Sequence, residues 1–277
     1  MGKYTLLTVQ LRLLPPKLRI RMGDQTPAEM VRMSHPHGAI CSYPKSGNTW
    51  LSFLLANLMR PGGTIRGTDV RDLVPDVHGL KAHDIDGDKA PAIFKSHEPF
   101  RPDYDRVVYL YRDPRDVMLS YYHYSKGLGT IAPDMTMDDY ITGFTSPDPS
   151  QNPPFGNWGE HVGSWFGACE DEPTFLPVSY EAMLEAPEAE LARVASFLEL
   201  EHDPDGIAAA VRQSSADEMR KLEKAGELHR QGHSSEFDNL TFIRKAKAGN
   251  WREELTPEAA RRIEDAFGPL MEKLGYL

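Results

Sequence analysis

The sequence lacks the residues that a disulfide framework, a metal centre or a membrane span requires. Of its 277 residues only two are cysteines, Cys41 and Cys169, which cannot build a disulfide framework and suit a reducing cytoplasm. No apolar run approaches the roughly 18 residues of a membrane-spanning helix. The histidines show no spacing typical of metal ligands, and His35 and His37, for instance, are only two residues apart. We therefore expect a cytoplasmic protein that holds no metal.

Positive charge is also scarce. The chain carries 31 Lys and Arg against 41 Asp and Glu, a formal net charge of −10. Such a chain does not attract nucleic acid through its overall field, so any anion must be held by a local cluster of cations and backbone N–H groups. We expect no nucleic-acid partner. The hydrophobic content of 40 % and the charged content of 26 % are typical of a globular domain.

The N-terminal segment is basic and apolar and has no acid before Asp24. We expect an N-terminal extension over residues 1–30 and a single domain over residues 31–277. No small-residue cleavage site follows the apolar stretch, so a signal peptide is not expected. One interpretation is a peripheral contact between its cations and an anionic membrane surface. The alternative, a segment packed on the domain or a tail without structure, is favoured because Pro15 and Pro16 break any amphipathic helix there.

Strand-like and helix-like patterns alternate along the rest of the chain. We predict strands over residues 38–43, 92–95, 106–111 and 174–179, and helices over residues 50–59, 115–124, 158–168, 187–198, 207–218 and 256–274. Asp113 and Pro114 mark one helix start, and Thr256 and Pro257 mark another. Residues 60–90 are expected to form a loop region with one short helix at most. The alternation predicts an α/β fold, a single domain with a mainly parallel central sheet flanked by helices on both faces.

The segment Y-P-K-S-G-N-T-W, from Tyr43 to Trp50, lies between the first predicted strand and the first predicted helix. A glycine-containing turn at a helix N-terminus presents successive backbone N–H groups to an anion, and the helix dipole favours negative charge there. The candidate anion-binding residues are Lys45, Ser46, Gly47, Asn48, Thr49 and Trp50. Lys45 precedes the glycine, unlike the lysine of the nucleoside-triphosphatase loop G-x-x-x-x-G-K-S/T. The plainer alternative is an ordinary strand-to-helix turn with a solvent-facing lysine.

A second pattern joins Arg112, at the end of the third predicted strand, to Ser120, about two helical turns further on. A guanidinium fork and a hydroxyl at this spacing form a reasonable clamp for a phosphate. Taken alone, the segment is equally compatible with a surface charge network at the start of a helix.

A third pattern, Lys95-Ser96-His97, follows the second predicted strand. A histidine beside a lysine near an anion site suits a general base, because the ordinary pKa of the imidazole is about 6.5. The alternative is a loop histidine on the surface.

Together these patterns resemble the cytosolic type of PAPS-dependent sulfotransferase, where PAPS is 3′-phosphoadenosine-5′-phosphosulfate. The family's phosphosulfate loop reads Y-P-K-S-G-T-T-W, and only Asn48 departs from it. Arg112 and Ser120 stand at the positions of its 3′-phosphate motif, and Lys95 and His97 at those of its Lys-x-His element. The resemblance implies a P-loop-like strand-loop-helix for the phosphosulfate and a sulfotransferase domain over residues 31–277. The implied catalytic residues are His97, as the general base, with Lys45, Lys95 and Ser120.

The resemblance also implies a nucleotide site. Residues 244–251 are similar to the family's R-K-G-x-x-G-x-W segment, which wraps the 3′-phosphate. Tyr180 and Ser214 stand in segments similar to the two elements that contact the adenosine. Beyond the phosphosulfate loop, the implied nucleotide-binding residues are Arg112, Ser120, Tyr180, Ser214, Arg244, Lys245 and Ala246.

Three departures from the family pattern stand out. Ala246 replaces a glycine, which puts a backbone conformation with positive φ in question there. Ala216 lacks the aromatic ring that would stack on the adenine, so stacking would fall to Trp50. The family's dimer motif is poorly kept, because its positions are occupied by Arg252, Thr256, Pro257 and Arg261.

The expected activity is an in-line transfer of a sulfuryl group from PAPS to a hydroxyl, or an amine, of a small acceptor, leaving adenosine 3′,5′-bisphosphate. One alternative is a P-loop kinase or nucleoside-triphosphatase. The order of Lys45 and Gly47 counts against it, as does the lack of an obvious Mg²⁺-binding acid at a strand end apart from Asp113. A second alternative is a nucleotide-binding module without catalysis, against which the presence of all the catalytic residues counts.

Loops should line the acceptor site, at about residues 60–90, 125–157 and 220–245. Their aromatic residues include Phe144, Phe155 and Trp158. Residues 220–250 are polar and rich in glycine, and we expect them to order when the nucleotide binds.

Overall fold

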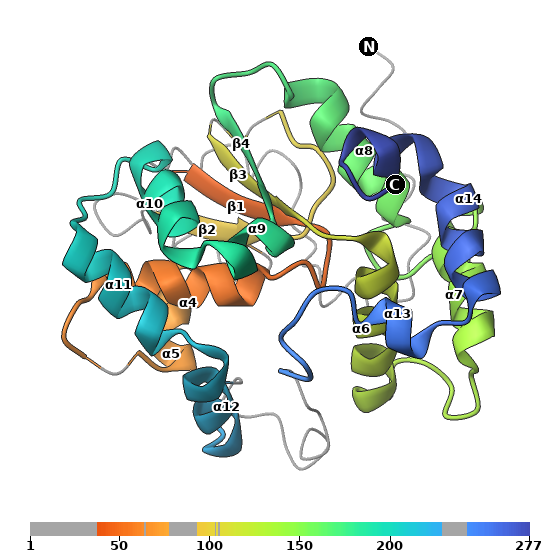
Figure 1. The fold of residues 1–277 in the computed structure, drawn as a ribbon, viewed down its shortest axis with the longest axis horizontal. Coiled ribbons are helices and arrows are strands. Elements are labelled where there is room, and N and C mark those ends of the chain that lie inside the picture. Colours follow the sequence, from red (N-terminus) through yellow and green to blue (C-terminus); the bar gives the residue numbers. More distant parts are fainter. Residues whose placement is uncertain (1–37, 64, 78–92, 103, 105, 229–242) are drawn as a thin grey trace.

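A sheet of parallel strands forms the centre of the protein. The computed structural model describes residues 38–277 apart from 64, 78–92, 103, 105 and 229–242. Strands β1 (Gly38–Ser42), β2 (Ile93–Ser96), β3 (Val107–Tyr111) and β4 (Phe175–Ser179) lie in the order β2-β1-β3-β4 (Figure 1). All neighbouring strands run parallel, which confirms the predicted α/β fold. The expected extension over residues 1–30 lies outside the described residues.

Strand β1 lies in the interior of the sheet, and all 5 of its residues are buried. Ala39 is paired with Phe94 of β2 on one side and with Val107 of β3 on the other. Because helices cover both faces, the strands are short apolar runs without polar alternation. The carboxyl ends of the strands meet at one edge of the sheet, which is where ligands bind in open parallel sheets.

One face of the sheet carries an aromatic core under the helices α6 (Pro114–Gly127), α7 (Met137–Thr145), α8 (Trp158–Cys169) and α14 (Pro257–Lys273). The ring of Tyr109 on β3 lies 5.6 Å from that of Trp165 on α8 and 6.0 Å from that of Phe175 on β4. Such aromatic pairs contribute about 0.5–1.5 kcal/mol each beyond the apolar area that they bury. The aromatic core thereby holds α8 against the sheet.

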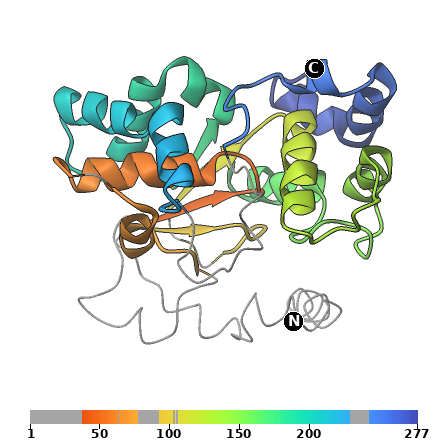
Figure 2. The same ribbon diagram turned by 90° about the horizontal axis from the view of Figure 1, so that it is seen from below.

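The opposite face is aliphatic and is covered by α4 (Asn48–Met59), α9 (Tyr180–Glu185), α10 (Pro187–Phe197) and α11 (Pro204–Gln213). Ile40 and Val108 point to this face and alternate with strand residues that point to the aromatic core. Beyond α4, helices α5 (Gly67–Leu73) and α12 (Ala216–Lys224) enclose a small cluster around Phe53. Helices α4 and α6 lie on opposite sides of the end of β1 (Figure 2). None of the helices in the described ranges is both long and apolar enough to cross a bilayer.

The two helix starts that Asp113-Pro114 and Thr256-Pro257 mark are confirmed. Asp113 caps α6 by accepting a hydrogen bond from the Arg115 N–H at 2.9 Å, and Thr256 caps α14 by accepting one from the Ala259 N–H at 3.1 Å. Proline follows each cap, at the helical position where a missing N–H costs nothing. Helix α5 is the short helix expected within residues 60–90, of which residues 78–92 lie outside the described residues.

The single helix predicted over residues 207–218 is wrong. Helix α11 ends at Gln213, and α12 begins at Ala216. Ser215 caps α12 through the N–H of its third residue, and the carbonyl of Ser214 accepts a hydrogen bond from Trp50 Nε1 at 3.0 Å. Serine side chains that bond the nearby backbone compete with helix continuation, which explains the break.

The expected loop over residues 125–157 contains a helix, α7, and two of the three aromatic residues expected near the acceptor are core residues. Phe144 and Trp158 are both 0 % exposed within the aromatic core. They therefore cannot line an acceptor site, contrary to the expectation from the sequence. Two short helices, α9 and α13 (Trp251–Glu254), were not predicted either, because each is too short to show a clear apolar period.

Candidate functional site

The loop between β1 and α4 has the geometry typical of an anion-binding loop. Gly47, at the helix N-cap, has a φ of 104°, and α4 begins with no hydrogen bond from a capping side chain. A Cβ atom at Gly47 would lie 2.7 Å from Tyr180 Cδ2, so only glycine fits there. Ser46 Oγ is buried and has no hydrogen-bond partner among the described residues. A helix N-terminus with uncapped N–H groups and a hydroxyl without a partner suits a phosphate or sulfate oxygen.

Asn48 differs from the other residues of this loop. Its Nδ2 donates to Ser42 Oγ at 3.2 Å, and the carbonyl oxygens of Ile40 and Ser96 lie 3.4 Å from the same atom. The buried amide thus ties α4 to the ends of β1 and β2. The side-chain Nδ2 of Asn48 is thus engaged within the protein.

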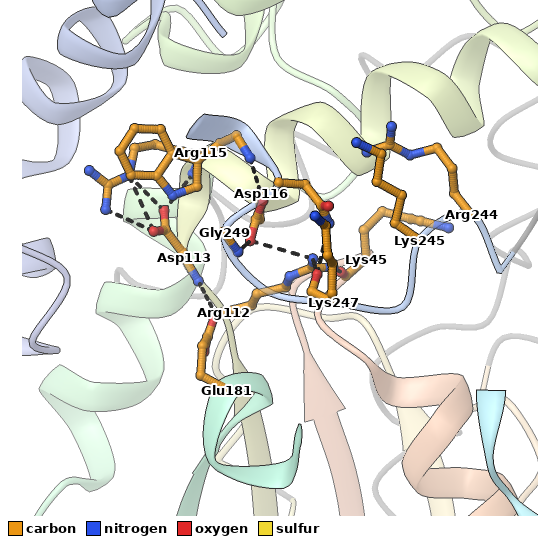
Figure 3. A network of polar contacts seen from close by, with 12 residues as sticks. Lys45, Arg112, Asp113, Arg115, Asp116, Glu181, Arg244, Lys245, Lys247 and Gly249 are labelled. Carbon is orange, nitrogen blue, oxygen red and sulfur yellow. Dashed lines mark hydrogen bonds and ion pairs between the residues drawn. The ribbon is translucent and has the colours of Figure 1, made fainter. Parts of the chain in front are cut away.

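The guanidinium of Arg112 connects the loops at the edge of the sheet (Figure 3). Nη1 donates to the carbonyl of Lys45 at 3.3 Å, and Nη2 donates to the carbonyl of Lys247 at 3.2 Å. The group also lies over the ring of Tyr180, 4.2 Å from its centroid. Arg112 Nε is buried and has no partner among the described residues. Arg112 therefore connects the loop between β1 and α4, here called the first loop, with residues 243–250, here called the late segment. Its Nε is a donor that no described residue uses.

The ammonium group of Lys45 lies 3.8 Å from the centroid of the Tyr124 ring. Burial, and next the charge of Arg112, lower the pKa of Lys45 to about 7, against a smaller opposing effect of Glu223. Lys45 itself has a φ of 71°, a strained conformation for a side chain with a Cβ. An anionic ligand beside this ammonium, in addition to Glu223, would favour the charged form. Binding of such a ligand would therefore raise the pKa of Lys45.

Asp116 holds the late segment in place. Its Oδ2 accepts a hydrogen bond from the Gly249 N–H at 2.6 Å, and its Oδ1 accepts one from the Trp251 N–H at 3.0 Å. The same carboxylate lies 3.6 Å from Arg112 Nη2, and it is almost fully buried. Ala246, in this segment, has a φ of 52°, so its methyl group does not prevent the left-handed conformation that the sequence put in question.

The cations of this segment are paired with two glutamates of α13. Arg244 and Lys245 lie 2.6 Å and 2.8 Å from Glu254, and Lys247 lies 2.7 Å from Glu253. Burial raises the pKa of Glu254, but hydrogen bonds from Lys245 and Arg244 outweigh it and lower that pKa to about 2. The residues expected to bind a phosphate are therefore engaged by carboxylates inside the protein.

His97 lies where β2 ends and contacts the end of β1. Its Nδ1 is 2.9 Å from the carbonyl oxygen of Ser42 and 3.2 Å from Ser42 Oγ. A carbonyl oxygen only accepts, so Nδ1 carries the proton and the lone pair of the neutral ring lies on Nε2. The ring of Phe155, whose φ is 80°, lies 5.9 Å away. This is the tautomer that a general base acting through Nε2 needs.

The remaining predicted residues surround these groups. Trp50 and Tyr180 pack edge to face with ring centroids 5.9 Å apart. Ser214 is buried, and its Oγ accepts a hydrogen bond from Asn57 at 3.0 Å. Lys95 Nζ lies 3.7 Å from Asp76, beyond hydrogen-bond distance. Half-buried positions are occupied by Thr49, in the first turn of α4, and by Ser120, on α6.

Sequence reasoning missed Asp116, Glu253 and Glu254. Asp116 stands only four residues after Arg112, so a charge pair of opposite sign between the strand end and the helix start was visible in the sequence. Acids directly after a basic segment are a further signal of internal pairing. In the described ranges, no three His, Cys, Asp or Glu side chains gather as metal ligands would.

A family model described as "Sulfotransferase domain" matches residues 35–275. Sulfotransferase 1B1 of Mus musculus is 28 % identical over 266 residues, which cover 90 % of this chain and 84 % of that protein. The amine sulfotransferase of Oryctolagus cuniculus is 25 % identical, with 82 % and 78 % covered. Cytosolic sulfotransferase 17 of Arabidopsis thaliana is 26 % identical, with 86 % and 75 % covered.

Solved structures share the fold. A mouse sulfotransferase complexed with PAP matches with a TM-score of 0.70 at 19 % identity, covering 91 % of this chain and 90 % of that one. Retinol dehydratase, in complex with androsterone and the inactive cofactor PAP, matches with a TM-score of 0.68 at 20 % identity, covering 88 % and 83 %. At this identity the likeness concerns the fold alone.

The carboxylate of Asp116 should be the main support of the late segment. Asp116→Asn keeps the shape but turns an N–H donor toward Gly249, Trp251 or Arg112, so we expect a loss of about 3 kcal/mol in the free energy of unfolding. Urea denaturation measures this loss, and hydrogen exchange should show faster exchange of the Gly249 and Trp251 amides.

The matched control is Asp217→Asn, which removes an exposed pair with Arg220. It should cost less than about 1 kcal/mol. Equal losses for the two variants would contradict a special role for Asp116.

Proposed function

The chain belongs to the sulfotransferase domain family, and we propose that it transfers a sulfuryl group from PAPS to a hydroxyl or an amine of a small acceptor. The observation that carries the proposal is the meeting of the 43–47 loop, Arg112 and His97 at one edge of the sheet. The amine sulfotransferase among the relatives and the androsterone in a neighbouring structure support a small acceptor. We also propose a cytoplasmic location, which the name of the plant relative supports.

The donors at this edge fit PAPS. Ser46 Oγ and Arg112 Nε are buried donors without partners among the described residues, and such donors are normally satisfied by a ligand or water. The N-terminus of α4 adds backbone N–H groups and a favourable dipole. We assign PAPS and its product, adenosine 3′,5′-bisphosphate, to Lys45, Ser46, Gly47, the Asn48 backbone, Thr49, Trp50, Arg112, Ser120, Tyr180, Ser214, Arg244, Lys245 and Ala246.

The chain's own residues move the proton and offset charge. PAPS, when bound, supplies the sulfuryl group, whose S–O bond to the phosphate breaks as the bond to the acceptor forms. His97 accepts the acceptor's proton at Nε2, since its Nδ1–H donates to the Ser42 carbonyl. Lys45 stabilises negative charge on the transferred group, and Lys95 does so once its ammonium leaves Asp76. Phe155 borders His97 and lines the acceptor side.

Transfer from radiolabelled PAPS to a panel of phenols, sterols and amines tests the activity. His97→Ala should lower turnover by about 10² to 10⁴ and leave the affinity for adenosine 3′,5′-bisphosphate within a few-fold. His202→Ala, at an exposed loop position, is the control and should have no effect. Retention of more than about a tenth of turnover by His97→Ala, with chemistry rate-limiting, would reject His97 as the base.

Calorimetry should show far weaker binding of AMP than of adenosine 3′,5′-bisphosphate. Equal binding of the two nucleotides would reject the 3′-phosphate site.

Nucleotide binding should take up a proton at Lys45. The pKa of this group is about 7 without ligand, and an anion beside it raises the pKa. Above pH 7 the ligand-bound lysine is therefore charged while the ligand-free one is mostly neutral. The affinity should fall as the pH rises from about 7 to 9, by up to about tenfold per pH unit.

Calorimetry in buffers with different ionisation enthalpies measures this proton uptake directly. Lys45→Arg keeps the charge at every accessible pH, so its affinity should be flat over the same range. An equally steep profile in that variant would assign the proton to another group.

Glu254 should compete with the nucleotide for Arg244 and Lys245. Glu254→Gln removes the competing charge, so adenosine 3′,5′-bisphosphate should bind up to about tenfold more tightly. Glu201→Gln changes the net charge equally, at an exposed position between α10 and α11, and should leave the affinity unchanged. Weaker binding in Glu254→Gln would mean that Glu254 organises the cations rather than competes for them.

A further inference from the structure

Helix α8 holds the backbone that carries His97. His161 Nε2 lies 3.0 Å from the carbonyl oxygen of His97, and Trp165 Nε1 donates to the carbonyl of Glu98 at 3.1 Å. The two side chains are one helical turn apart, so they face the same segment. Residues 97 and 98 follow β2 directly. Their carbonyls therefore accept hydrogen bonds from side chains of α8 and not from a neighbouring strand.

The protonation of His161 follows from its two partners. The His97 carbonyl only accepts, so His161 Nε2 carries the proton and donates it there. His161 Nδ1 then accepts from the hydroxyl of Tyr109, at 2.9 Å. Burial lowers the pKa of His161 to about 3, and burial raises the pKa of Tyr109 well above its usual value. Both groups thus remain neutral, and two hydrogen bonds run in one direction, from Tyr109 through His161 to His97.

The surroundings of His161 exclude a direct role in the chemistry. The side chain is 1 % exposed, and the ring of Tyr43 packs edge-on against it with centroids 5.3 Å apart. Tyr43 begins the anion-binding loop, so His161 lies between that loop and the backbone of the base. The imidazole of His97 is held by the carbonyl of Ser42, whereas its main chain is held by His161. The direction of His97 Nε2 depends on both hydrogen bonds.

We propose that His161 is the positioning residue of the general base, and that Tyr109 selects the His161 tautomer that can donate to the His97 carbonyl. The inference rests on the proposed function, because it acts through His97. A group displaced by about 1 Å from its reacting partner can lose about 10²-fold in rate, so one backbone hydrogen bond at this point is enough to matter.

Three variants separate positioning from packing. His161→Leu removes the donor, and its turnover should fall by about 10- to 100-fold while the KM for the acceptor and the affinity for adenosine 3′,5′-bisphosphate stay within about two-fold. His161→Gln supplies an amide N–H and should recover part of the loss. Tyr109→Phe removes only one hydroxyl, so it remains informative should His161→Leu fail to fold, and its turnover should also fall.

A double-mutant cycle shows whether His161 acts through the base. His97→Ala combined with His161→Leu should be no slower than His97→Ala alone. If His97→Ala is slow but His161→Leu retains wild-type turnover, or if the two losses multiply, the positioning role is overturned and the proposed function stands. If His97→Ala is as active as wild type, or wild type transfers no sulfuryl group, the proposed function fails and this inference fails with it.

The tautomer has its own readout, which does not depend on activity. Nitrogen-15 NMR of labelled histidine should show His161 protonated at Nε2 alone and without titration from about pH 5 to 8. Tyr109→Phe should alter the Nδ1 resonance of His161 or admit the other tautomer. A His161 that titrates in this range, or carries its proton on Nδ1, in the wild-type protein overturns the proposal.

Discussion

The ion pair between Arg112 and Asp116 lies at the point where the loops of this protein meet. Asp116 accepts hydrogen bonds from the backbone of the late segment, and Arg112 donates to the same segment and to the first loop. A buried carboxylate and a buried guanidinium each need partners to offset the loss of water. Because both contact the late segment and Arg112 also contacts the first loop, the geometry of this edge depends on the pair.

The edge is cationic in a chain that is strongly acidic, and the protein manages that charge internally. The ammonium of Lys45 lies against the ring of Tyr124, and the pKa of this lysine is lowered. Arg244 and Lys245 are paired with Glu254. Unpaired cations crowded together would repel one another and destabilise the fold. Under the proposed function, the nucleotide would have to replace these carboxylates as the partner of Arg244 and Lys245. Its affinity would then reflect the difference between the two sets of contacts.

His97, the proposed general base, is held by a different part of the fold. Its ring is oriented by β1 and its main chain by α8, and α8 is itself fixed by the aromatic core around Tyr109 and Trp165. The ring of Tyr109 packs in that core, and its hydroxyl contacts His161 Nδ1, for which we propose tautomer selection. In this way the position of one imidazole depends on a core that lies behind it, away from any ligand.

The strands, most helices, the capped starts of α6 and α14 and the glycine-containing turn before α4 could be predicted from the sequence, because each depends on neighbours a few residues away. It could not show that residues 207–224 form two helices, since the break involves a hydrogen bond from Trp50 to Ser214. Phe144 and Trp158 were predicted to line the acceptor site. The folded structure shows that they are core residues, because they pack in the aromatic core. Asp116 accepts a hydrogen bond from Gly249, 133 residues further along the chain, and His161 contacts the carbonyl of His97 over a separation of 64 residues. Hydrogen bonds over such separations leave no periodic pattern in a sequence, so these supporting contacts became visible only in the folded structure.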